Sequence, residues 1–200
     1  MGLLERRQPV VFAGENHMIT LFGPGTDRAI ASISCWRCTY SAQGEGFTLA
    51  MWCDPEAAGI PDGPATAVFT DNVAMSRMVM ARLNQYFASY DGRGLAERDP
   101  TTARFSQQFG GRRFHRILCA SDQATIELEW RDVSDGALEV FDNDSGPERF
   151  DVTSVICPCR EGLITVNGVR LQGRSRAADH DVPSSSFLAF SETWVAQKQE

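Results

Sequence analysis

Long apolar runs are missing from this 200-residue sequence. A membrane-spanning helix needs about 20 consecutive apolar residues, and no stretch approaches that length. The opening stretch, MGLLERRQPVVFAG, also lacks the apolar segment of about 7–15 residues that a secretory signal requires. We therefore expect no membrane partner and a cytoplasmic location, where the six cysteines would be free thiols.

Positive charge is also scarce, with 19 lysines and arginines against 26 aspartates and glutamates and a formal net charge of −7. A nucleic-acid surface needs a clustered basic footprint that neutralises phosphates. The densest basic stretch, GGRRFHR at residues 110–116, holds only three arginines. We therefore expect no nucleic-acid partner.

Sequence motifs that bind cofactors or carry well-known catalytic groups are not found either. The sequence has no Gly-x-Gly-x-x-Gly after a predicted strand and no phosphate-binding loop ending in Gly-Lys-Ser/Thr. It also has no Gly-x-Ser-x-Gly and no His-Glu-x-x-His. These absences argue against nucleotide cofactors, serine-hydrolase chemistry of that type and zinc-protease chemistry, so we expect no cofactor.

What the sequence does contain is an alternation of apolar and polar residues with a period of two, which is typical of half-buried β-strands. The alternation is clearest in ATIELEW, residues 124–130. Asn167-Gly168 lies between two apolar pairs and predicts a two-residue hairpin turn with positive φ at both residues. Further strands are expected at 8–13, from 17 onward, and at 27–41, 47–53, 65–69, 103–109, 113–120, 149–157 and 185–196.

One helix is predicted near residues 71–90, where Met75, Val79 and Leu83 recur at helical spacing. About nine strands and one long helix indicate a mainly β fold of the α+β type, in a single domain over 1–200. We expect a strongly curved antiparallel sheet that closes into a β-barrel, with a bent sheet wrapped on the helix as the alternative. The pattern resembles that of lipocalin-like barrels, although the Gly-x-Trp signature of their first strand is not evident.

The cysteines admit two interpretations. Cys35 and Cys38 have the spacing of half a zinc site or of a redox pair. Their separation of three residues, however, places them on opposite faces of a regular strand, where two thiolates cannot meet at one metal. Small buried hydrophobic residues are therefore the favoured interpretation, while a four-thiolate zinc site with Cys157 and Cys159 stays open as the alternative.

Two residues are candidates for catalysis. His115 alternates with Ile117 and Cys119 along one strand face, where an imidazole could act as a general base; a hydrogen-bonded core histidine is the commoner outcome. Glu127 shares the polar face of its strand with Glu129 and would be a base if that face lined a cavity. A solvent-facing role is favoured for it, because antiparallel sheets commonly expose one face.

Other side chains are candidates for holding a ligand. Arginines would hold a carboxylate or phenolate, tryptophans would supply aromatic walls, and methionines would supply a pliable wall or, more commonly, adaptable core packing. Glu192 is noted as a further polar residue in a strand of bulky neighbours. The predicted ligand-binding residues are Arg37, Arg113, Trp36, Trp52, Trp130, Met75 and Met78.

These observations favour a protein that binds a small, largely apolar or aromatic molecule in a barrel cavity. The missing cofactor motifs favour proton-transfer chemistry on that molecule, as in a lyase, dehydratase, isomerase or cyclase. A non-catalytic carrier or sensor with the same cavity is the first alternative, and a zinc-stapled interaction module is the second. An exposed sheet edge or helix face would also allow a homodimer.

Overall fold

The computed structural model describes residues 9–86, 90, 92–143, 149–179 and 182–197. Strands dominate this part of the chain, and one helix interrupts them. The elements are β1 (Val10–Phe22), β2 (Ala29–Ser41), β3 (Gly46–Cys53), β4 (Thr66–Thr70), α1 (Val73–Tyr86), β5 (Thr101–Thr102), β6 (Arg104–Phe109), β7 (Phe114–Ala120), β8 (Thr125–Val133), β9 (Ala137–Asn143), β10 (Phe150–Val166), β11 (Val169–Arg170) and β12 (Ser186–Ala196).

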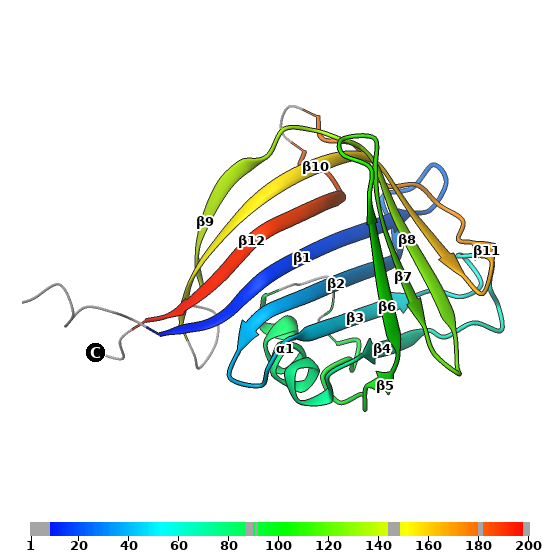
Figure 1. Ribbon diagram of the computed structural model, residues 1–200. Helices are drawn as coiled ribbons and strands as arrows, with labels where there is room; N and C mark the ends of the chain where they lie inside the picture. Colours follow the sequence, from blue (N-terminus) through cyan, green and yellow to red (C-terminus); the bar gives the residue numbers. More distant parts are fainter. Residues whose placement is uncertain (1–8, 87–89, 91, 144–148, 180–181, 198–200) are drawn as a thin grey trace, which may run out of the picture.

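The strands form one strongly curved sheet that nearly closes into a barrel (Figure 1). The order along the sheet is β5-β4-β3-β2-β1-β12-β10-β8-β7-β6, and β9 and β11 both pair with β10. All pairings are antiparallel except that of β4 with β5. The predicted mainly β fold with a curved antiparallel sheet and a single helix is confirmed.

Two hydrophobic cores lie on opposite faces of the sheet. On β2, for example, Cys35 points to one core and Trp36 to the other, as the alternation of side chains requires. The barrel-side core fills the space between β1–β4 and β6–β8 and includes Ile19, Ile33, Leu49, Ile117, Leu128 and Trp130. The helix-side core lies between the sheet and α1 and includes Phe12, Trp36, Trp52, Met75, Val79 and Trp194.

Strand β1 is continuous where the sequence pattern indicates two shorter strands. The register between β1 and β2 shifts at Ala13/Gly14. A Cβ atom on Gly14 would lie only 2.0 Å from the carbonyl oxygen of Arg37. Glycine therefore permits the close approach of the two strands, and the residues between the two predicted strands form an irregularity within one strand.

The C-terminal half of the sheet differs from the sequence prediction in one long strand and one additional strand. Strand β10 runs for 17 residues because its first half pairs with β9 and β12 and its second half with β8 and β11. The sequence pattern misses β9, whose Leu138 and Val140 are exposed and so carry little amphipathic signal. The predicted hairpin is confirmed, with Asn167 at φ 50° and Gly168 at φ 79°.

Helix α1 ends at Tyr86, and positions 87–89 of the predicted helix lie outside the described residues. Within the described chain, no helix is long and apolar enough to span a membrane.

Candidate functional site

Two buried imidazoles lie next to each other inside the barrel. His17 is on β1 and His115 on β7, their ring centroids are 4.9 Å apart, and their exposed fractions are 0% and 1%. Both side chains point inward because they alternate with outward-facing residues on their strands. Two titratable rings in an otherwise apolar interior are unusual, since polar groups are costly to bury without partners.

A carboxylate, an amide and a guanidinium connect these imidazoles. Glu15 Oε2 lies 3.4 Å from His17 Nε2, and Arg37 Nη1 donates a hydrogen bond to Glu15 Oε1 over 3.2 Å. Gln107 Nε2 lies 3.2 Å from Glu15 Oε2 and 3.0 Å from His115 Nε2. We call Glu15, His17, Arg37, Gln107 and His115 the histidine cluster.

The hydrogen bonds fix the neutral tautomer of each ring. His17 Nδ1 accepts the backbone N–H of Ala189 over 3.2 Å, so its proton is on Nε2, which faces Glu15 Oε2. The Gln107 amide donates to both Glu15 and His115, because the opposite orientation would place its oxygen against the carboxylate. The proton of His115 is therefore on Nδ1.

His115 Nδ1 is buried and has no hydrogen-bond partner in the described part of the protein. An unsatisfied buried N–H costs roughly 1–3 kcal/mol. Such groups are rare in folded proteins and often mark a functional site.

Burial and neighbouring charges shift the pKa values of the cluster. Burial lowers the pKa of His17, although Glu15 opposes the shift, and burial together with the nearby His17 lowers the pKa of His115 to about 3. Burial opposes ionisation of Glu15, but its contacts with His17, Gln107 and Arg37 prevail and lower its pKa to about 2. At neutral pH the cluster thus holds two neutral imidazoles and one carboxylate balanced by one guanidinium.

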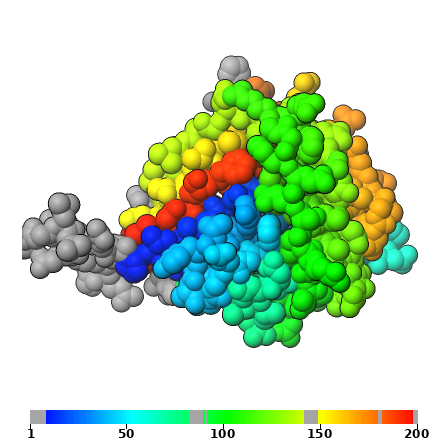
Figure 2. Space-filling model, in the orientation of Figure 1, coloured from blue at the N-terminus to red at the C-terminus, as the bar shows by residue number. Residues whose placement is uncertain are grey.

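Aromatic rings lie around the His115 imidazole. The ring of His115 lies 5.4 Å from Phe109, 5.7 Å from Trp130 and 6.2 Å from Phe190, between ring centroids. Trp130 is fully buried, whereas Phe190 is half-buried and Phe109 is 62% exposed. Phe109, Phe190 and Arg37 are thus at least partly exposed beside the buried imidazoles. Figure 2 shows the face of the molecule on which β12 (red) and β1 and β2 (blue) lie next to the green segment that contains β6.

The structure brings together three of the predicted site residues, His115, Arg37 and Trp130. Sequence reasoning missed Glu15 and Gln107 and placed His17 only at the start of a strand. The shared strand face of Glu15 and His17, two residues apart, was the available signal. Their proximity to β7 depends on closure of the barrel, which no local pattern contains.

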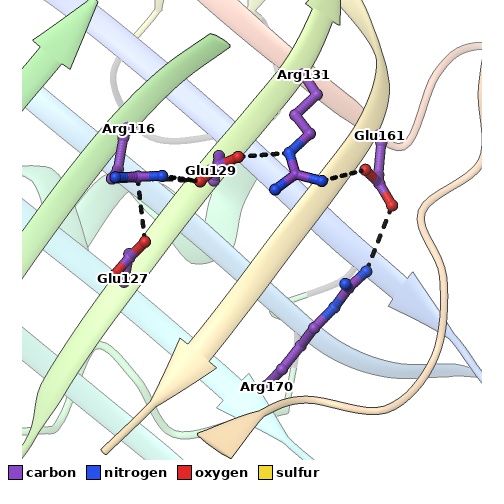
Figure 3. Close-up of polar contacts among 6 residues, drawn as sticks. All are labelled: Arg116, Glu127, Glu129, Arg131, Glu161 and Arg170. Carbon is purple, nitrogen blue, oxygen red and sulfur yellow. Dashed lines mark hydrogen bonds and ion pairs between the residues drawn. The ribbon is translucent and has the colours of Figure 1, made fainter. Parts of the chain in front are cut away.

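Glu127 lies apart from this cluster, on the outer face of the sheet. It is half-exposed and pairs with Arg116, with 3.1 Å between Glu127 Oε1 and Arg116 Nε. The pair belongs to a ladder of alternating charges across β7, β8, β10 and β11 (Figure 3). Glu127 and His115 therefore do not form an acid–base pair.

Arg113, a predicted ligand-binding residue beside the β6–β7 turn, is exposed.

The remaining predicted ligand-binding residues lie in the helix-side core. Trp36, Trp52, Met75 and Met78 are buried there, on the opposite face of the sheet from His115. The predicted set is thus divided by the sheet and cannot line one pocket.

The helix-side face has its own buried carboxyl group, Glu192 on β12. Trp194 Nε1 donates a hydrogen bond to Glu192 Oε1 over 2.8 Å, and Asn16 donates another. Ser34 Oγ in turn donates to Asn16 Oδ1 over 2.8 Å. Burial outweighs these hydrogen bonds and raises the pKa of Glu192 to about 7.

The cysteines do not converge. All six are free thiols; Cys35 faces the barrel-side core and Cys38 the helix-side core. Burial raises the pKa of Cys159 to about 12 and raises that of Cys35 well above its usual range, which disfavours thiolates. Over the described ranges, no group of three or more His, Cys, Asp or Glu side chains is arranged to hold a metal ion.

No protein-family model, no curated protein and no solved structure matches this chain.

Proposed function

We propose that the protein binds a small, largely apolar or aromatic molecule that carries a hydrogen-bond acceptor, at the histidine cluster. One observation carries the proposal: the buried Nδ1–H of His115 has no partner in the described chain, and the imidazole that bears it lies among aromatic rings. A ligand oxygen accepting this proton would recover the free energy lost by burying the donor. The surrounding rings would pack against the ligand's apolar part.

The charges of the cluster favour a neutral acceptor, such as a carbonyl or ether oxygen. Arg37 is already paired with Glu15, so it is not free to neutralise an anionic ligand. The Glu15 carboxylate lies on the same side of the barrel and would repel a second anion. An aromatic ketone therefore fits the cluster better than the carboxylate or phenolate ligand predicted from the sequence.

A carrier or sensor is the form of this function that the geometry supports best. A histidine with a pKa of about 3 is a weak base, and so is a carboxylate with a pKa of about 2. Cofactor-independent proton transfer, as in a lyase or isomerase, is the second candidate. It is favoured by the Gln107 side chain, which links Glu15 to His115: Glu15 would remove a proton from the ligand while His115 Nδ1–H stabilises the resulting enolate oxygen.

Acetophenone and ethylbenzene provide a matched pair of probes, because they have nearly the same size and only the ketone accepts a hydrogen bond. We expect acetophenone to bind about 10-fold more tightly, since one buried hydrogen bond contributes about 1 kcal/mol or slightly more. In the His115→Phe variant this preference is expected to disappear. Ser34→Ala, which removes a hydrogen bond on the other face of the sheet, should retain it. Chemical-shift titration by NMR measures millimolar affinities of this kind.

Equal affinity of the wild-type protein for both probes would contradict the proposal, as would a preference that survives in His115→Phe. The same samples in D2O distinguish carrier from enzyme. Proton transfer would accelerate deuterium exchange into the methyl group of acetophenone, whereas a carrier leaves the exchange rate unchanged.

A further inference from the structure

A half-open pocket of about 540 Å³ lies on the outside of the barrel, away from the histidine cluster. It is formed where the end of β8, the second half of β10 and β11 meet the chain after β11. Its volume falls in the range of small-molecule sites. Its charged lining residues are Asp132, Arg160, Glu161, Arg170 and Arg174.

One arginine of the pocket is already held in place by the charge ladder of Figure 3. Arg170 Nη2 lies 3.4 Å from Glu161 Oε1, and Arg131 Nη1 lies 3.3 Å from Glu161 Oε2. Glu161 is thus neutralised from both sides. The ladder positions the Arg170 guanidinium at the pocket without leaving a net negative charge there.

The other two arginines of the pocket have no such partners. Arg160 and Arg174 are exposed, and neither guanidinium forms a hydrogen bond or ion pair with any described residue. The lining carries three arginines against two acids, Asp132 and Glu161, and so has a net positive charge in a chain whose overall charge is −7. A concave positive region on an acidic protein attracts and concentrates anions.

We propose that this pocket binds a small molecule that carries a doubly charged oxyanion group, such as a phosphate monoester. The planar guanidinium groups of Arg160 and Arg174 supply paired N–H donors whose spacing matches phosphate or carboxylate oxygens. The pocket is larger than a single phosphate ion, so it also leaves room for the organic part of the ligand. This site is independent of the proposed function of the histidine cluster.

Isothermal titration calorimetry with inorganic phosphate at low ionic strength tests the proposal. The Arg160→Gln/Arg174→Gln double variant is expected to bind phosphate at least 10-fold more weakly than the wild-type protein. Arg98→Gln/Arg104→Gln, which removes the same charge from two exposed arginines outside the pocket, is the matched control and should change the affinity less than 2-fold. Affinity of the wild-type protein is expected to fall as KCl is added.

Succinate in place of phosphate distinguishes the two sources of oxyanions. Tighter binding of succinate, lost in the same double variant, would support the site and assign it to dicarboxylates. Equal loss of phosphate affinity in both double variants would overturn the proposal, because it would show a general charge effect. Absence of binding by the wild-type protein at millimolar phosphate and succinate would overturn it as well. Thermal unfolding of both variants verifies that each is folded.

Discussion

Replacing Trp130 by alanine is expected to lower the free energy of unfolding by about 4 kcal/mol, the largest effect anticipated for a single substitution in this protein. Trp130 is fully buried in the barrel-side core, and its Nε1–H donates a hydrogen bond to the carbonyl oxygen of Met18 over 3.0 Å. Alanine would leave a cavity beside His17 and His115 and would remove the hydrogen bond to the Met18 carbonyl oxygen. Urea-induced unfolding followed by circular dichroism measures the change.

Trp130→Phe is the intermediate case. It keeps most of the apolar contact and loses the hydrogen bond, so we expect a cost of about 2 kcal/mol. Leu138→Ala, at an exposed position on β9, is the control and should cost less than about 0.5 kcal/mol. A cost below about 1 kcal/mol for Trp130→Ala would contradict a tightly packed barrel interior around the imidazoles.

Replacing Glu192 by glutamine is expected to remove a pH dependence of stability. Burial raises the pKa of Glu192 to about 7 in the folded protein, from 4.5 for an ordinary glutamate. Between pH 4.5 and about pH 7, the Glu192 carboxyl group is protonated in the folded state and ionised in the unfolded state. The stabilisation is therefore fully present below pH 4.5 and is lost as the pH rises through 7.

The difference of about 2.5 pKa units corresponds to roughly 3 kcal/mol. Glu192→Gln should therefore be more stable than the wild-type protein by less than about 1 kcal/mol near pH 5 and by about 3 kcal/mol near pH 8.5. The two histidines add an opposite trend, since their lowered pKa values destabilise the folded state as the pH falls below 6.5. That trend is common to both proteins, so the difference between them isolates Glu192.

Urea-induced unfolding at several pH values from 5 to 8.5 supplies this difference. Glu139→Gln, which changes an exposed carboxylate on β9, is the matched control and should follow the wild-type curve. If the free energy of unfolding of Glu192→Gln changed with pH in parallel with that of the wild-type protein, Glu192 would not be a buried acid with a raised pKa.

The fold is largely predictable because its main signals are local. The alternation in residues 124–130 requires a dry face with Ile126, Leu128 and Trp130, and these three side chains are buried in the barrel-side core. Asn167-Gly168 forms the predicted turn because few other dipeptides tolerate positive φ at both positions. His115 shares the inward face with Ile117 and Cys119, as its alternation indicates.

The site is less predictable because it depends on contacts between distant strands. His17 and His115 are 98 positions apart, and their rings meet only when β6–β8 fold across β1–β4. The sequence also cannot tell which face of the sheet α1 covers. Because α1 packs on one face, Trp36 and Met75 lie in the helix-side core, on the opposite face from Arg37 and His115. The predicted ligand-binding residues are therefore divided between the two faces.

The histidine cluster is tested most directly by a ¹H–¹⁵N NMR spectrum of the histidine side chains at pH 6, before and after addition of acetophenone. We predict that His115 is neutral with its proton on Nδ1, that His17 is neutral with its proton on Nε2, and that the ketone shifts the His115 Nδ1 resonance while His17 Nδ1 stays in place. A protonated His115 at pH 6, or a His115 resonance that does not respond to saturating acetophenone, would contradict the account.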